Sequence, residues 1–288
     1  MSRKLLLLAA SVALLSGAAS FAHAADIIDP PVIDLPEPVM PVAHAATGGW
    51  YIRGDIGYSA NKMSDVEYVT SSGGLIGSGK LLGILSTNYS GGVGVGYDTG
   101  NYLRTDLTLD YFSNSNFRGT STGTCTSVAA GGAQVACTTR DTASYSALSI
   151  MANAYIDLGK YSGFTPYIGA GIGGTHVKWG TLTNDFDNTL VTNPDETHPG
   201  ATNWRFTYAL MAGASYDVTD CLAIDAGYRF RKIEGGKMFG IGTAGTTGPA
   251  HDKGIKAHDF RVGARYKFGG CGGSHVPDYQ PDYQPVYK

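Results

Sequence analysis

Apolar or aromatic residues alternate with small or polar residues along most of this chain. Between positions 258 and 268, for example, Phe260, Val262 and Tyr266 fall on one face and Arg261 and Lys267 on the other. A two-residue period is that of a β-strand whose faces meet different surroundings. Eight stretches show it, and polar, Gly-rich gaps separate them: 50–58, 89–97, 102–112, 142–158, 164–178, 204–216, 222–231 and 258–268.

The gaps alternate between long and short. Residues 59–88, 113–141, 179–203 and 232–256 form long polar connections, whereas 98–101, 159–163 and 217–221 are short enough for tight turns. Transmembrane β-barrels have long external loops and short periplasmic turns. We therefore predict an all-β fold, an eight-stranded antiparallel transmembrane β-barrel with four long external loops, three short periplasmic turns and both termini in the periplasm. A soluble β-protein is the alternative, but its exposed faces would carry fewer aromatic residues.

The aromatic residues fall near the ends of the predicted strands. Membrane barrels carry aromatic girdles at both lipid–water interfaces, although aromatics are also common in any strand. The predicted periplasmic girdle consists of Trp50, Tyr97, Tyr216, Tyr266 and Phe268, and the outer girdle of Tyr58, Tyr89, Tyr111, Trp204, Tyr228 and Phe230.

Both ends of the chain differ from its centre. Arg3 and Lys4, an apolar stretch to Phe21 and an Ala-x-Ala site at 22–24 predict a secretory signal peptide over residues 1–24. No later window reaches the roughly 18 apolar residues of a spanning helix. We expect a Pro-rich disordered periplasmic arm at 25–48, the barrel at 49–268 and a Pro/Tyr-repeat periplasmic tail at 269–288. The tail is either an inert extension or a contact to the cell wall or another envelope protein.

Composition agrees with twisted strands and excludes one class of partner. The chain has 41 glycines, 18 tyrosines and only 16% charged residues, and its net charge of −3 predicts no nucleic-acid partner. Four cysteines in an exported chain predict disulfides. Topology favours Cys125 with Cys137 inside one long loop and Cys221 with Cys271 at neighbouring strand ends, and the alternative is that some stay free.

The inward faces of the predicted strands carry charges of both signs. An eight-stranded barrel has an interior about filled by side chains, so buried charges must pair. We interpret this set as a structural ion network that plugs the lumen, with a narrow or gated ion path as the alternative. The predicted network contains Arg53, Asp55, Arg104, Asp106, Asp110, Arg205, Asp225, Arg229, Arg261 and Arg265.

Other candidate chemistry is weaker. The segment from Gly169 to Gly174 matches the dinucleotide fingerprint G-x-G-x-x-G, but strand alternation surrounds it where that motif needs a helix, so we expect the glycines to relieve crowding. Nothing places a Ser, a His and an Asp together, and we predict no enzyme. His176, His198 and His251 are loop candidates for metal or haem, yet scattered histidines are more often solvated, and we expect no cofactor and no metal.

Three segments resemble one family. They run from Phe164 to Gly174, from Gly213 to Phe230 and from Phe260 to Phe268. The chain, over roughly 50–268, resembles the small eight-stranded outer-membrane barrels of the opacity and surface-antigen type, related in architecture to the outer membrane protein A barrel. Such barrels usually end on an aromatic residue of the last strand, whereas here twenty residues follow Phe268.

The resemblance implies an integral outer-membrane protein with surface-exposed loops, surrounded by outer-membrane lipid. We expect a structural, envelope or adhesion-type interaction role, with a host or envelope partner at the external loops. The stretches 59–88 and 113–141 are long enough to bind such a partner. The alternative is a small porin that passes ions or small solutes through a narrow or gated lumen.

Overall fold

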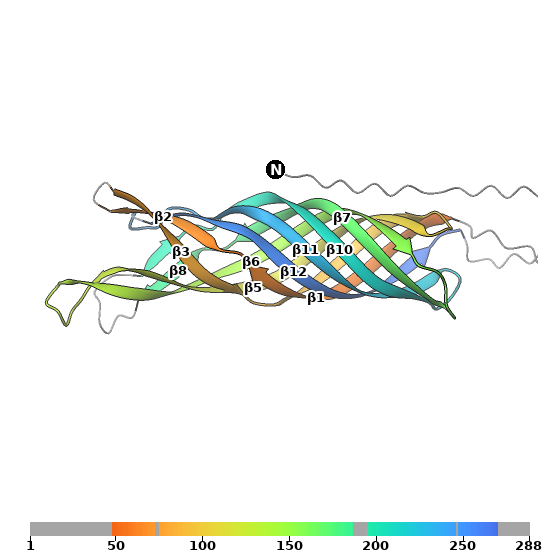
Figure 1. Cartoon of the computed structure of the whole chain (residues 1–288), viewed down its shortest axis with the longest axis horizontal. Coiled ribbons are helices and arrows are strands. Elements are labelled where there is room, and N and C mark those ends of the chain that lie inside the picture. The colour runs from red at the N-terminus through yellow and green to blue at the C-terminus, as the bar shows by residue number, and fades with distance from the viewer. Residues whose placement is uncertain (1–47, 73–74, 187–194, 246, 270–288) are drawn as a thin grey trace, which may run out of the picture. The chain divides into compact units, whose positions relative to one another are not determined.

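Eight long antiparallel strands close into a barrel in the computed structural model, which describes residues 48–72, 75–186, 195–245 and 247–269 (Figure 1). Each strand of the ring pairs with two neighbours, and the last strand pairs with the first. The predicted fold class is therefore correct. The ring consists, in order, of β1 (Gly49–Met63), β4 (Asn88–Asp98), β5 (Leu103–Thr126), β6 (Gln134–Asp157), β7 (Phe164–Trp179), β10 (Thr202–Asp217), β11 (Leu222–Phe239) and β12 (Thr247–Lys267).

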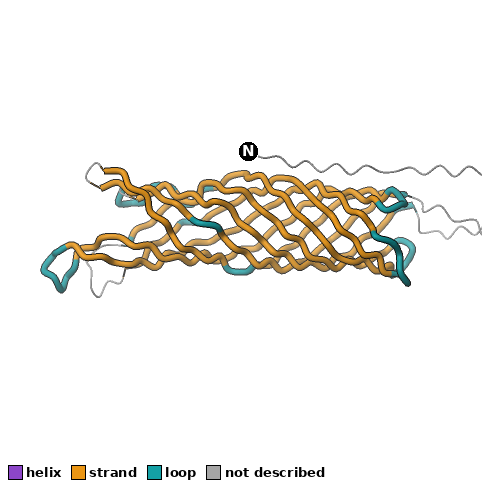
Figure 2. The backbone as a smooth tube through the Cα atoms, viewed as in Figure 1, coloured by secondary structure: helices purple, strands orange, loops and turns teal. Residues whose placement is uncertain are grey.

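Four shorter strands extend the wall at one end. β2 (Val66–Ser72) and β3 (Leu75–Leu85) form a hairpin between β12 and β5, while β8 (Leu182–Phe186) pairs with β6 and with β9 (Glu196–His198). At the opposite end the connections are short, as predicted: between β4 and β5, between β6 and β7, and between β10 and β11 (Figure 2).

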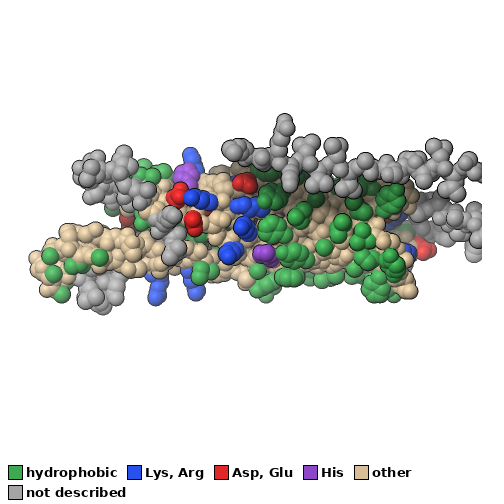
Figure 3. Space-filling view, viewed as in Figure 1, with side chains coloured by type: hydrophobic (Ala, Val, Ile, Leu, Met, Phe, Trp, Pro, Cys, Tyr) green, Lys and Arg blue, Asp and Glu red, His purple; other side chains and the backbone are tan. Residues whose placement is uncertain are grey.

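A belt of apolar side chains covers the outside of the barrel near its short-turn end (Figure 3). Ile56, Val93, Leu107, Ile172 and Val262 are all exposed on it. Side chains that face the acyl chains of lipid must be apolar, and backbone polar groups within a bilayer must be paired inside the protein. The apolar belt and the closed ring of strands meet these two requirements. From Trp50 to Tyr58, β1 crosses it with about nine residues, the length that a tilted strand needs to span a bilayer.

The four long connections lie at the end opposite the short turns, as predicted, but much of their described length is strand rather than loop. β5 and β6 continue far beyond the belt to Thr126 and Gln134, and β11 and β12 to Phe239 and Thr247. Above the bilayer the outward positions are polar, as at Asn116 and Arg118, while the apolar side chain of Phe117 points inward. The chain keeps its alternation there but lacks an apolar outer face.

The inside of this outer extension holds the main apolar core of the described residues. Phe112, Phe117, Tyr145, Trp179 and Phe239 are each at most 2% exposed. Phe117, Trp179 and Phe239 contact one another, with ring centroids 5.6 to 6.1 Å apart, and Tyr145 lies 5.0 Å from Trp179. This aromatic cluster fills the barrel above the membrane and holds its wall together.

The predicted signal peptide (1–24), nearly all of the predicted arm (25–48) and nearly all of the predicted tail (269–288) lie outside the described residues, and these boundaries stay predictions. In the described ranges, no helix has the length and apolar character needed to cross a membrane.

Candidate functional site

A chain of ion pairs runs through the lumen of the barrel. Four arginines and four aspartates alternate in it, each buried and each joined to the next by an ion pair of 2.7 to 3.2 Å. We call it the lumen chain, and its order is Asp106, Arg53, Asp55, Arg261, Asp110, Arg229, Asp259 and Arg231. Equal numbers of positive and negative groups leave it without net charge.

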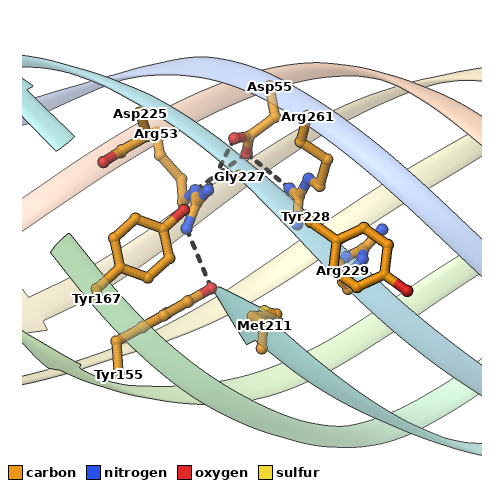
Figure 4. Close-up of a pocket in the computed structure, with 10 residues that line it drawn as sticks. All are labelled: Arg53, Asp55, Tyr155, Tyr167, Met211, Asp225, Gly227, Tyr228, Arg229 and Arg261. Atoms are coloured by element: carbon orange, nitrogen blue, oxygen red, sulfur yellow. Dashed lines mark hydrogen bonds and ion pairs between the residues drawn. The ribbon is translucent and has the colours of Figure 1, made fainter. Parts of the chain in front are cut away.

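The lumen chain connects strands that are not neighbours in the ring. Arg53 of β1 holds Asp106 of β5 at 2.8 Å and also donates to the Tyr155 hydroxyl of β6. Arg229 of β11 contacts Asp110 of β5, on the far side of the ring. Buried charges are tolerated when they are paired with opposite charges. The contacts therefore brace the barrel from within, and Figure 4 shows the one between Arg53 and Tyr155.

Four predicted network residues lie outside the lumen chain. Arg104 forms a bidentate pair with Asp157 at 2.7 Å, and Arg265 lies 3.6 Å from Asp225, both near the short turns. Arg205 pairs with Asp252 at 2.6 Å in the outer extension. The structure thus places all ten predicted residues inside the wall, but in several separate groups.

The network predicted from the sequence did not include four residues that pair with these arginines and aspartates. Arg231 and Asp259 end the lumen chain, while Asp157 and Asp252 neutralise Arg104 and Arg205. Asp252 lies in a stretch treated as loop, which hid its direction, whereas Arg231 ends the predicted strand 222–231 on the same face as Asp225 and Arg229. Asp259 does fall on the inward face of the strand pattern at 258–268, so the alternation alone was a sufficient signal for it.

The space left in the lumen is small. A cavity of about 10 Å³, lined by Arg53, Asp55, Tyr155, Tyr167 and Arg261 among others, lies beside the lumen chain (Figure 4). That volume is about what one water molecule requires. The aromatic cluster lies above it, and the guanidinium of Arg231 lies 3.7 Å from the ring centre of Phe112 between the two. Among the described residues, side chains fill the interior from the charged layer to the aromatic layer.

Glycines make room for the large inward side chains. A Cβ atom at Gly213 or at Gly227 would lie 2.6 Å from the Tyr167 hydroxyl, and one at Gly171 would overlap the Asn153 amide. Since real Cβ atoms do not approach so closely, these positions favour glycine. Residues 169–174 belong to β7 and open no helix, so the crowding explanation of the G-x-G-x-x-G match agrees with the structure.

The predicted girdle residues all point outward. Trp50 and Tyr97 are paired across β1 and β4 with ring centroids 5.5 Å apart, and at the other end of the same strands Tyr58 and Tyr89 are 5.8 Å apart. Tyr111, Trp204, Tyr216, Tyr266 and Phe268 are also exposed, whereas Tyr228 and Phe230 are half-buried against His258 and other neighbours.

The β5–β6 hairpin is the second candidate site. Its strands pair continuously from Ser115 with Tyr145 to Thr126 with Gln134, and the loop 127–133 closes the far end (Figure 2). The predicted disulfide between Cys125 and Cys137 is present, with Cα atoms 5.8 Å apart. Cys221 is buried at the start of β11, and Cys271 lies outside the described residues, so that second pairing stays a prediction.

The three candidate histidines have different surroundings. His176 packs on Trp204 on the outer wall, His198 is buried with Glu196 at 3.9 Å, and His251 is exposed on β12. No group of three or more His, Cys, Asp or Glu side chains within the described ranges has an arrangement that holds a metal ion.

Comparison with known proteins gives one family. The outer membrane protein beta-barrel domain matches residues 10–268. An uncharacterized protein of Brucella suis is 38% identical over 86% of this chain and 93% of its own length. Outer membrane protein PagN of Salmonella typhimurium is 31% identical over 78% of this chain and 92% of its own.

Two more distant similarities were found. A putative adhesin of Rickettsia bellii is 25% identical, covering 92% of this chain and 99% of the relative. Among solved structures, the outer membrane protein OprG of Pseudomonas aeruginosa aligns over 78% of this chain and 98% of its own, with 16% identity and a TM-score of 0.43.

Proposed function

Since the chain belongs to the outer membrane protein beta-barrel domain family and is an integral protein of the bacterial outer membrane, we propose that it has an adhesion-type role. The proposed binding surface is the outer part of the β5–β6 hairpin, and the proposed partner is a host or envelope molecule at the cell surface. The relatives named as putative adhesins in Rickettsia bellii support this class of function.

The single observation that carries the proposal is how far this hairpin extends. From Tyr111 at the outer girdle, β5 continues to Thr126, roughly 50 Å along the strand at about 3.3 Å per residue. The loop 127–133 lies farther from the apolar belt than the rest of the described barrel (Figure 2). A disulfide near the tip holds the two strands together. A protein that functions only as a pore does not require a long arm that is cross-linked near its tip.

The outer hairpin has the chemistry of a surface that pairs with another chain. Residues 119–139 contain no charged residue, and several of their threonines, such as Thr122, Thr124 and Thr138, are exposed. β3 covers the edge of β5 only as far as Thr120, and β8 covers β6 only from Thr139. Within the described ranges, no strand borders 121–125 or 134–138 on their other edges. Uncharged free edges accept a further strand, so we propose strand addition as the mode of binding.

The filled lumen argues against the porin alternative. The lumen chain and the aromatic cluster lie one above the other inside the ring, and the cavity between side chains holds about 10 Å³. Conduction requires a continuous water path or a gate that opens one. Opening one here would break several buried ion pairs at once, which is energetically costly.

The orientation belongs to the same proposal. β1 starts and β12 ends at the short-turn end of the barrel, and the hairpins extend from the other end. Outer-membrane barrels have their short turns in the periplasm. We therefore place both termini there and the β5–β6 hairpin outside the cell.

Adhesion by cells that display a shortened hairpin would test this proposal. The variant replaces residues 122–138 by Asn-Gly, so that Ser121 and Thr139, which are already register partners, flank a two-residue turn. The control shortens the β2–β3 hairpin by replacing 69–78 in the same way between the partners Tyr68 and Gly79. We expect the first variant to lose adhesion to epithelial cells and the control to retain it, with equal surface amounts of folded protein. Unchanged adhesion in the first variant would refute the role of this hairpin.

A further inference from the structure

Three lysines form a straight row across three neighbouring strands. Lys62 of β1 is the register partner of Lys256 of β12, and Lys256 is in turn the partner of Lys232 of β11. Their side chains point outward, since the adjacent Ile233 and Ile255 are fully buried inside the wall. Lys62 and Lys256 are exposed and Lys232 is half-buried. We call this the lysine row.

The lysine row lies just beyond the apolar belt. Four residues closer to the short turns on each strand, Tyr58, Phe260 and Tyr228 form a parallel row at the level of the outer aromatic girdle. Four residues correspond to about 13 Å along a tilted strand. Charged side chains gather where the hydrophobic cover ends in Figure 3. At this height a side chain of the barrel wall meets lipid headgroups rather than acyl chains.

The three ammonium groups of the lysine row repel one another, and a bound anion would relieve that repulsion. Directly opposite residues on paired strands have Cβ atoms about 5 Å apart, and like charges there are destabilising. None of the three ammonium groups forms an ion pair with a described carboxylate. Lys232 donates to the backbone oxygen of Lys253, while Lys253 itself pairs with Glu67 at 2.7 Å farther out. The described residues therefore provide no ion-pair partner for this row of positive charge on the membrane-facing wall.

We propose that the lysine row binds the phosphate groups of outer-leaflet glycolipid. A phosphate beside two lysines on paired strands can accept hydrogen bonds from both ammonium groups, and lysine binds phosphate well as a point charge. Three lysines in a line match a lipid headgroup with more than one phosphate or two neighbouring lipids. Such binding removes the repulsion within the row. It concerns the lipid around the barrel and is independent of the proposed adhesive hairpin.

Lipid binding by the folded, delipidated full-length mature protein would test this. The probes are bisphosphorylated lipid A and the same lipid A after removal of both phosphates, and native mass spectrometry counts the bound molecules. The row variant carries K62Q, K232Q and K256Q. The control variant carries R118Q, R140Q and K178Q, which removes the same charge from exposed outward positions on β5, β6 and β7. A third variant with arginine at the three row positions keeps the charge.

We expect the unmodified protein, the control and the arginine variant to retain bisphosphorylated lipid A. The row variant should bind it roughly a hundredfold more weakly, at about fivefold for each lysine. Equal losses in the row and control variants would mean that only total charge matters and would overturn the proposal. Equal binding of the dephosphorylated lipid would assign recognition to the acyl chains and overturn it as well. Heat-modifiable mobility in gels confirms that each variant is folded.

Discussion

Arg229 and Asp110 are 2.8 Å apart although their strands, β11 and β5, stand on opposite sides of the eight-stranded ring. The pair therefore spans the lumen, and both residues continue to further partners, Arg229 to Asp259 and Asp110 to Arg261. A barrel braced across its width in this way has a fixed cross-section.

Removing one carboxylate from the middle of the lumen chain should be strongly destabilising. The variant Asp110→Ala leaves Arg229 and Arg261 buried with fewer partners, and breaking a buried ion pair typically costs about 3–5 kcal/mol. Urea-induced unfolding in lipid vesicles measures this loss. Asp185→Asn, at an exposed position of β8, is the matched control and should change the free energy of unfolding by less than about 0.5 kcal/mol. A similar free energy of unfolding in both variants would mean that the lumen chain does not stabilise the barrel.

The folded protein should be electrically silent in a planar bilayer. Side chains fill the lumen through two layers, and the space beside the lumen chain holds about one water molecule. Single-channel recording of the refolded protein, beside a variant with R104Q and R261Q, distinguishes the proposed role from the porin alternative. A steady conductance that changes with these substitutions would show that the lumen is a pore.

Reduction of the Cys125–Cys137 disulfide should loosen the tip without weakening the barrel. The bond closes a short loop, for which about 3 kcal/mol of stabilisation is typical. That free energy acts on the outer hairpin alone, because no described strand flanks the hairpin at the disulfide. In the double variant C125S/C137S, limited proteolysis should cut within 121–138 faster than in the unmodified protein. Its urea midpoint should stay the same. A lowered midpoint would show instead that hairpin and barrel unfold together.

The second predicted disulfide is open to a direct measurement. Cys221 directly precedes β11 and lies next to the end of β12, where Lys267 donates its backbone N–H to the Cys221 oxygen at 2.8 Å. Position 271 follows four residues later in the sequence, so we predict that mass mapping of the unreduced protein finds a peptide that links Cys221 to Cys271. A link between Cys221 and Cys125 would contradict the topology, because these two residues lie at opposite ends of the barrel.

The sequence was most informative where the bilayer surrounds the chain. Lipid demands apolar side chains at every second position, so the strands of the belt and the inward direction of residues such as Arg53 and Asp106 could be predicted. The pairing among the charged residues could not, since it depends on the stagger of the strands around the ring. That Arg229 meets Asp110 rather than a neighbour follows from the register of all the strands between them.

Outside the apolar belt, apolar side chains at every second position no longer identify the strands. Thr122 and Thr124 read as loop because nothing apolar alternates with them, yet they belong to a regular strand. The inward Phe117, Trp179 and Phe239 are far apart in the sequence. These side chains come together only when the barrel closes, so no local sequence pattern predicts their cluster.

The continuity of β5 and β6 from membrane to tip determines how the protein responds to a pulling force. Each strand runs without a break in the chain from the short-turn end to the outer hairpin, flanked in the membrane by β4 and β7. A load on the tip is directed along the strands, perpendicular to the hydrogen bonds of these ladders. The ladders are then sheared, so that many hydrogen bonds resist together instead of opening one after another. Tension at the tip therefore passes directly into the membrane-embedded wall.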